Sequence, residues 1–365
     1  MNILLTTDNF QQFAGAELVT IEIVEHFRAR GHACTVAAWF VGPPMKAIAQ
    51  RLGISVTDEP ATLNAFDFNL VWEHNQLAPV LQYELKPTSC DQTYFAWRHL
   101  SATSNCGVPG LVLHNLICDR TYAVSEETKT FLIELGIAAD DIMLFPNPAP
   151  DSFHRRAPRK SGDQLRSILV VSNHAPPEIK DALKILHSRG LKVEHVGQDG
   201  SGQRRVTADL LQRWDVVVTI GKTVQYALCS RMPAFVYDKY GGPGYLTADN
   251  FARAAWYNFS GRCTHTVLDA AGIADALIHG FADARQVVDA LPHTVTEAYR
   301  LAPYLDELLD AATRAHPNAQ RMILLQNHRA MLKRESILCA GAGNAYRGRN
   351  AFKRRYEYLK AQAGR

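Results

Sequence analysis

Two segments of the chain repeat one order of apolar and polar positions. Residues 3–39 run from an apolar strand pattern through a helical pattern to a second strand pattern, and residues 168–196 do the same. The helical pattern stops at Gly31 in the first segment and at Gly190 in the second. Each segment therefore predicts a strand–helix–strand unit whose helix ends with a glycine just past its last turn.

Further apolar runs extend both units. Residues 68–72, 93–97 and 121–124 predict strands, and the continuous run 215–220 is typical of a strand buried in a parallel sheet. The segment 126–135 predicts a helix with Ser125 as its N-cap and Gly136 at its end. From about residue 292 the pattern is helical, and after 340 nothing repeats the strand–helix alternation.

Strands that alternate with helices predict an α/β chain of two Rossmann-like domains in tandem. We place the first domain at 1–155, a Pro- and base-rich linker at 156–166, the second domain at 167–300 and C-terminal helices with a basic tail at 301–365. A chain of 365 residues is long enough for two such cores. Folds of this kind bind ligands beyond the carboxyl ends of their strands, so two facing domains favour a cleft enzyme.

The composition favours a soluble globular protein with reduced cysteines. The apolar fraction is 47% and the charged fraction 21%, which is typical of a soluble globular chain. We find no signal peptide and no run of 18 apolar residues. The seven cysteines have no C-x-x-C spacing, which favours reduced thiols and a cytoplasmic protein over a disulfide framework or a zinc site; they are Cys34, Cys90, Cys106, Cys118, Cys229, Cys263 and Cys339.

The net charge of +3 hides an asymmetry. Residues 320–365 contain eleven Lys or Arg and two Glu, a net charge of +9, so the rest of the chain carries −6. Aromatic residues are interleaved among the last of these bases, at Tyr346, Phe352, Tyr356 and Tyr358. Such a segment fits an anionic membrane surface or, less well, a nucleic acid, and a solvated helical tail is the plain alternative.

Four segments, in order, resemble motifs of one enzyme family. Phe13-Ala14-Gly15-Ala16-Glu17 resembles a G-G-A-E loop, and Val124-Ser125-Glu126 with the later Phe145-Pro146-Asn147-Pro148 resembles the exit from a first domain. Segment 221–233 resembles an L-E-A-M-A-x-G-x-P helix, and segment 238–245 the Gly-Gly loop after it. Over residues 1–290 the chain is thus similar to GT-B glycosyltransferases, particularly family 4. The resemblance implies a GT-B fold, two Rossmann-like domains facing across a cleft, here with a helical basic C-terminal extension.

The second domain contains most candidate donor-binding residues. Lys222 and Thr223 follow a buried strand at a helix N-terminus, where free N–H groups favour a diphosphate. The segment is no Walker A loop, because Val216 stands where that motif needs a glycine. We expect the nucleotide sugar to contact Gly15, Asn173, His174, Lys180, Lys222, Thr223, Gln225, Asp238, Gly241, Gly242, Gly244 and Tyr245.

Histidines that follow first-domain strands are the candidate catalytic residues. The resemblance implies a histidine facing the donor sugar after a strand such as 94–97, and His99 matches that position best, with His74 second. For each residue the alternative is a histidine packed at a strand end with its ring nitrogens satisfied. His114 lies in a segment that we expect to be a loop.

The chain departs from the family pattern at its acidic residues. Family-4 enzymes have two glutamates seven residues apart, whereas here the second maps to Gln225 and no Glu precedes it in the strand or loop before the helix, where Thr219, Ile220 and Gly221 stand. No D-x-D motif is present, so we expect transfer without a metal or other cofactor. Retaining and inverting outcomes both stay open.

The expected function is a hexosyltransferase-like enzyme. It would move a sugar from a nucleotide-sugar donor to a glycan or lipid-linked acceptor in surface polysaccharide or glycoconjugate biosynthesis, in the cytoplasm or at the inner membrane face. A sugar-nucleotide epimerase of the same fold and a non-catalytic relative that binds a sugar nucleotide or a partner protein are the alternatives. Glycosylation of nucleic acid depends on the basic tail alone.

Overall fold

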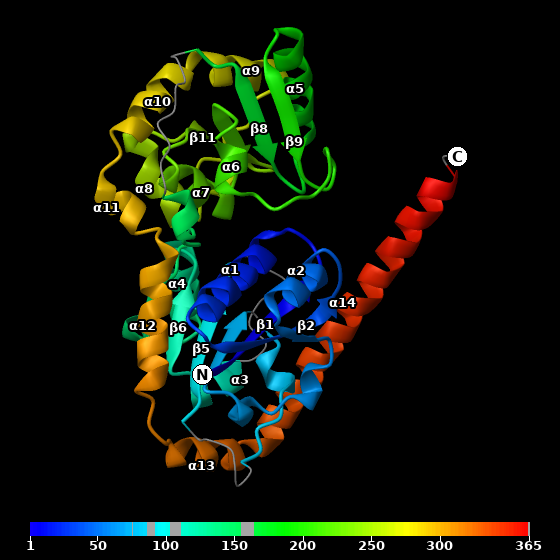
Figure 1. The fold of residues 1–365 in the computed structure, drawn as a ribbon, viewed down its shortest axis with the longest axis vertical. Coiled ribbons are helices and arrows are strands. Elements are labelled where there is room, and N and C mark those ends of the chain that lie inside the picture. Colours follow the sequence, from blue (N-terminus) through cyan, green and yellow to red (C-terminus); the bar gives the residue numbers. More distant parts are fainter. Residues whose placement is uncertain (75, 86–91, 103–110, 155–163, 364–365) are drawn as a thin grey trace.

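The computed structural model describes residues 1–74, 76–85, 92–102, 111–154 and 164–363 (Figure 1), with side chains through 345 and at 347–349. Most of the expected linker 156–166 lies outside the described residues, as do Cys90 and Cys106. The side chains of Tyr346, Phe352, Tyr356 and Tyr358 lie outside them as well.

The first domain is built on a seven-stranded parallel sheet with the strand order β3-β2-β1-β4-β5-β6-β7. Its strands are β1 (Asn2–Phe10), β2 (Ala33–Val41), β3 (Ser55–Thr57), β4 (Leu70–His74), β5 (Tyr94–His99), β6 (Arg120–Ala123) and β7 (Ile142–Leu144). Alternate side chains of a strand point to opposite faces, so Ile3 and Leu5 enter one core cluster and Leu4 enters another. Both faces of this sheet are therefore covered.

The helices of this domain are α1 (Gly15–Ala29), α2 (Met45–Leu52), α3 (Leu111–Ile117) and α4 (Glu126–Glu134). The expected capping of α4 is confirmed, because the Ser125 hydroxyl accepts a hydrogen bond from the Thr128 N–H. The expectation of a loop at His114 is wrong, since that residue lies in α3.

The second domain has a five-stranded sheet with the order β12-β11-β10-β8-β9. Its strands are β8 (Ser167–Val171), β9 (Lys192–Val196), β10 (Val216–Thr219), β11 (Ala234–Asp238) and β12 (Gly241–Tyr245). All pairs are parallel except β11 with β12, which are antiparallel. The glycine-rich segment 241–245, expected as a loop, is thus an edge strand.

The helices of the second domain are α5 (Pro177–Ser188), α6 (Ala208–Leu211), α7 (Lys222–Cys229), α8 (Ala248–Trp256), α9 (Ala270–His279), α10 (Phe281–Asp289) and α11 (His293–Glu297). The succession of helices therefore starts near residue 248 rather than 292. The two helix stops are confirmed, since Gly31 (φ +80°) and Gly190 (φ +87°) adopt the left-handed conformation that ends a helix.

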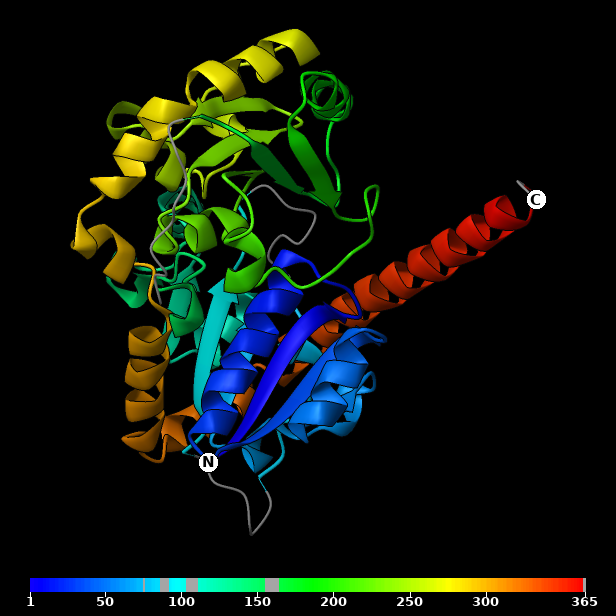
Figure 2. The same ribbon diagram turned by 45° about the horizontal axis from the view of Figure 1, so that its top comes forward.

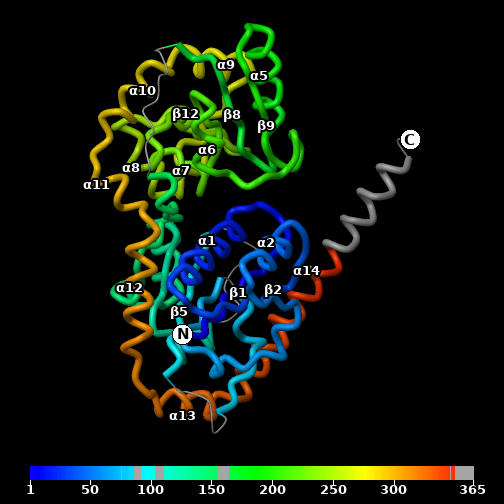
Figure 3. The backbone as a smooth tube through the Cα atoms, in the orientation of Figure 1, coloured from blue at the N-terminus to red at the C-terminus, as the bar shows by residue number. Residues whose placement is uncertain are grey.

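The last three helices, α12 (Leu301–Thr313), α13 (Ala319–Asn327) and α14 (Arg329–Ala363), return to the first domain (Figures 1 and 3). Leu305 and Leu308 of α12 join the core cluster that α1 covers. Leu325 of α13 and Cys339 of α14 join the cluster on the other face. After residue 300 the chain therefore completes the first domain.

The architecture confirms the expected α/β class, with two domains built on parallel strands and a helical C-terminal region. Figure 2 shows the second domain above the first, with α14 running beside the first domain. No helix within the described residues is long and apolar enough to cross a membrane.

Candidate functional site

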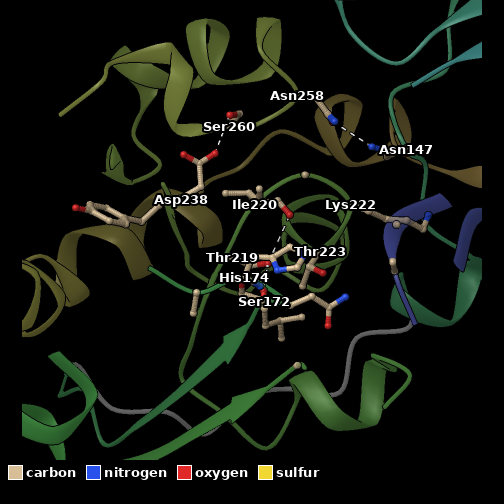
Figure 4. Close-up of a pocket in the computed structure, with 18 of the residues that line it drawn as sticks. Asn147, Ser172, His174, Thr219, Ile220, Lys222, Thr223, Asp238, Asn258 and Ser260 are labelled. Carbon is tan, nitrogen blue, oxygen red and sulfur yellow. Dashed lines mark hydrogen bonds between the residues drawn. The ribbon is translucent and has the colours of Figure 1, made fainter. Parts of the chain in front are cut away.

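A cavity of about 650 Å³ lies between the two domains (Figure 4). The first domain lines it with the loop from β1 into α1 and with residues that follow β5 and β6. The second domain lines it with the carboxyl ends of β8, β10 and β11 and the loops that follow them. The cavity thus occupies the place where folds of parallel strands bind ligands.

Two helices begin at the cavity wall. Helix α1 starts after Ala14, which provides no side-chain cap, and α7 starts after Gly221, whose φ of +54° suits a glycine. Gly15 and Thr223, in the first turns of these helices, line the cavity. The unpaired N–H groups and the positive end of each helix dipole favour an anion at this wall.

Charged side chains also line the cavity, and most of the cations among them have carboxylate partners. The basic or imidazole side chains in the lining are His174, Arg204, Lys222, Lys239 and Arg262, against the acidic Glu127 and Asp238. Arg204 is paired with Glu194 at 2.7 Å. Lys222 and Arg262 are paired as well, with Glu22 and Glu127. The preference for an anionic ligand, such as a diphosphate, therefore rests on the helix N-termini together with Lys239 and the exposed His174.

Lys222 already has partners on the other domain. Its ammonium lies 2.8 Å from a carboxylate oxygen of Glu22 on α1 and donates to the Pro148 carbonyl at 3.1 Å. Tyr226 donates its hydroxyl hydrogen to the other Glu22 oxygen. Burial lowers the pKa of Lys222, an effect that the charge of Glu22 opposes. Figure 4 shows the Lys222 side chain directed toward the blue ribbon of the first domain, so it links the domains.

Gln225 lies outside the lining and belongs to a polar chain between the domains. Its amide donates to the Asn258 oxygen at 3.2 Å, and Asn147 donates to the same oxygen at 3.1 Å (Figure 4). Asn147 in turn accepts from the buried Arg98 at 2.7 Å. Asn147 and Asn258 both line the cavity, so this chain fixes part of its wall.

Asn173 and His174 follow β8 and line the cavity, as expected for residues at a strand end. The Asn173 amide donates across the domain boundary to the Phe13 carbonyl at 3.2 Å, and its oxygen accepts from Gln203 at 3.0 Å. The His174 N–H donates to the Ser172 hydroxyl at 3.1 Å. The side chain of His174 is exposed, which leaves its imidazole open to a ligand.

Asp238, at the end of β11, holds the loop that contains Ser260 and Gly261. Its carboxylate accepts from the Ser260 hydroxyl at 2.8 Å and from the Gly261 N–H at 3.0 Å (Figure 4). Arg262, in the same loop, makes an ion pair with Glu127 at the start of α4, with oxygen distances of 2.5 and 3.2 Å. This pair spans the cavity from one domain to the other.

Several other candidate residues lie outside the lining. Lys180 pairs with Asp199 at 3.3 Å on the surface. Packing and backbone conformation account for the glycines of β12. A Cβ on Gly242 would lie 2.1 Å from the Val236 carbonyl oxygen, and Gly241 and Gly244 have left-handed φ angles. Tyr245 donates to the Leu277 carbonyl at 2.9 Å within a buried site.

His74 and His99 do not line the cavity either. The ring of His74 is fully buried, accepts from Trp72 at 2.8 Å and lies 3.4 Å from Arg98, and burial holds its pKa well below the usual value. Burial also lowers the pKa of His99 to about 3, and its Nε2 has no hydrogen-bond partner. Both imidazoles are neutral at physiological pH.

Charged or amide residues of the lining that were not predicted from the sequence as site residues include Glu127, Gln203, Arg204 and Lys239. Gln203 and Arg204 come from the connection between β9 and α6, which carries no motif. Only the topology could have indicated that this connection lines the cavity, because it follows the carboxyl end of a parallel strand. Tyr257, Asn258, Ser260 and Arg262, which follow α8, also contribute to the lining.

No protein-family model and no curated protein sequence matches this chain. Solved structures do share its fold. Alr3699/HepE from Anabaena, in complex with UDP and glucose, is 11% identical with a TM-score of 0.55, and the match covers 87% of this chain and all of that one.

Two glycosyltransferases match in the same way. The enzyme from Rickettsia africae ESF-5 is 14% identical with a TM-score of 0.57, covering 87% of this chain and 99% of that one. The calicheamicin glycosyltransferase CalG4 is 13% identical with a TM-score of 0.50, covering 86% and 99%. The chain therefore has the GT-B fold that the sequence motifs implied.

Proposed function

We propose that this protein is a glycosyltransferase that moves a sugar from a nucleotide-sugar donor to a glycan or lipid-linked acceptor, in the biosynthesis of surface polysaccharide or glycoconjugates. The observation that carries the proposal is the cavity between the carboxyl ends of the two sheets, where α1 and α7 begin. UDP and glucose in the similarly folded HepE support a nucleotide sugar as the donor class.

In this proposal the second domain holds the donor. Asn173, His174 and Thr223 would contact the nucleotide diphosphate, with the N–H groups of α7 behind them. Lys239 would stabilise the negative charge that develops on the leaving diphosphate. Arg204 and Arg262 would join it by exchanging their partners Glu194 and Glu127 for phosphate oxygens, so that no metal is required. The acceptor would enter beside the first-domain residues that follow β5 and β6.

Binding without catalysis is the second candidate, and the histidines favour it. Neither His74 nor His99 lines the cavity, so the first-domain side presents no imidazole from either residue to an acceptor hydroxyl. An epimerase would need free acid and base groups. In the described lining the two carboxylates, Glu127 and Asp238, are both held by hydrogen bonds or an ion pair.

Thermal unfolding with UDP-, GDP-, CMP- and dTDP-sugars, measured both with and without EDTA, tests the donor site. One nucleotide family at a hundred times its Kd should stabilise the protein by about 2.7 kcal/mol. His174→Ala should raise that Kd about tenfold. His187→Ala, which changes an exposed histidine at the other end of α5, is the matched control and should leave the Kd unchanged.

Absence of stabilisation by every nucleotide at millimolar concentration would overturn the proposal. Stabilisation that disappears with EDTA would contradict metal independence alone. Stabilisation without sugar transfer to any glycan or lipid-linked acceptor would favour the non-catalytic candidate, whereas epimerisation of the donor in the absence of acceptor would establish the epimerase.

A further inference from the structure

Exposed apolar side chains gather on the C-terminal helices. Of the nine large apolar side chains exposed in the described part of the chain, four lie on α13 and α14. Three of them belong to α14: Met331 (51% exposed), Ile337 (61%) and Leu338 (70%). Exposed apolar residues normally occur singly, so such a group on one helix calls for an explanation.

The opposite side of α14 is fixed to the first domain. Glu335 accepts hydrogen bonds from the Val112 and Leu113 N–H groups of α3, both at 2.9 Å. Cys339 is 1% exposed, and Gly343 lies so close to Trp39 that a Cβ would be 2.5 Å from its ring. The helix therefore cannot turn its exposed apolar residues inward without losing these contacts.

Basic residues accompany the apolar ones. Lys333 and Arg334 are exposed, and each precedes an exposed apolar residue by four positions, Ile337 and Leu338 respectively. Residues four apart are neighbours on a helix surface. We call the surface formed by Met331, Lys333, Arg334, Ile337 and Leu338 the α14 outer face.

We infer that the α14 outer face is a docking surface for an anionic lipid bilayer. A helix with apolar side chains between basic ones binds at the headgroup boundary, where the apolar groups enter the lipid and the cations meet anionic headgroups. Residues 320–365 carry a net charge of +9, and although Arg321 is buried in an ion pair with Asp119, the remaining positive charge complements such a surface. The inference rests on the proposed function in one respect, since a lipid-linked acceptor requires the enzyme at a membrane.

Flotation of the full chain with vesicles tests this inference. We expect binding to phosphatidylglycerol–phosphatidylcholine vesicles, little binding to pure phosphatidylcholine, and release by high salt. The double variant Ile337→Asp with Leu338→Asp should lower the bound fraction about tenfold, as should Lys333→Glu with Arg334→Glu. Val267→Asp is the control, because Val267 is 66% exposed but lies in the second domain.

Thermal unfolding of each variant without vesicles checks that the fold persists, and nucleotide stabilisation measured there tests the donor site separately. Failure of the wild-type chain to bind anionic vesicles would overturn the inference. Equal binding by the Ile337→Asp, Leu338→Asp variant would also overturn it. Dimerisation in sedimentation that this variant abolishes, without vesicle binding, would instead assign the face to a second copy of the chain.

Discussion

At the residue scale, burial shifts the pKa values of acidic as well as basic side chains in this protein. Glu17 stands in the first turn of α1, where a carboxylate is normally favoured by the helix dipole. It is only 3% exposed, and one of its oxygens has no hydrogen-bond partner. Burial raises its pKa from 4.5 to about 8, so the neutral acid is the form that fits the folded state.

This raised pKa predicts a pH dependence of stability. The contribution of Glu17 to the free energy of unfolding is fully present below pH 4.5 and is lost as the pH rises through about 8. Between these two values the Glu17 carboxyl ionises in the unfolded chain but stays protonated in the folded protein. Glu17→Gln should therefore gain stability relative to the wild type between pH 5 and pH 8, by at most about 1.4 kcal/mol per pH unit. Urea unfolding at several pH values measures the difference.

The matched control is Glu134→Gln, which changes an exposed glutamate of α4. Its stability relative to the wild type should stay constant over the same range. A constant difference for Glu17→Gln as well would contradict the assignment of a protonated Glu17.

At the scale of elements, the glycines of β12 show how packing can look like a ligand motif. From the sequence we expected Gly241, Gly242 and Gly244 to let the backbone approach a donor. In the structure they let an edge strand pack against neighbouring backbone. Both interpretations explain the glycines by a close approach of another group to the backbone. They differ in that group, which is a ligand in one case and a neighbouring protein segment in the other.

We predict that Gly242→Ala destabilises the protein by about 1–3 kcal/mol, since the new Cβ meets backbone atoms of β11 that cannot move away. Chemical denaturation measures the change. Gly15→Ala is the control, because no atom lies within 4 Å of the Cβ it adds, and its stability should equal or exceed that of the wild type. Equal stability of both variants would refute the packing explanation.

At the scale of the whole molecule, ion pairs join the two domains beside the cavity. Glu22 pairs with Lys222, Glu25 binds Arg205 through two contacts of 2.6 and 2.7 Å, and Glu127 pairs with Arg262. The first of these pairs is almost completely buried, with side chains 1% and 5% exposed. Removal of one partner leaves the other charge buried and unpaired.

Lys222→Met should accordingly destabilise the protein by about 3–5 kcal/mol, as measured by urea unfolding. The double variant Glu22→Gln with Lys222→Met removes both charges and should recover much of that loss. From the sequence alone we expected Lys222 to contact the nucleotide sugar. Unchanged stability together with a raised nucleotide Kd would restore that earlier interpretation.

The sequence by itself determined the two strand–helix–strand units, the helix stops at Gly31 and Gly190, the cap at Ser125 and the α/β class. These features follow from local periodicity and from backbone preferences that hold within a few residues. It also named Asn173, His174 and Thr223 as donor contacts. Each of them follows a parallel strand, and the parallel topology brings them to one cavity.

Only the tertiary structure decided which polar residues face that cavity. Lys222 and Gln225 lie one turn apart on α7, yet their polar groups meet Glu22 and Asn258, which stand far away in the sequence. Arg204 enters the lining from a connection without a motif, and α14 returns to cap α3 through Glu335. The physical reason is that side-chain partners across a domain boundary depend on packing between distant segments, which no local pattern encodes.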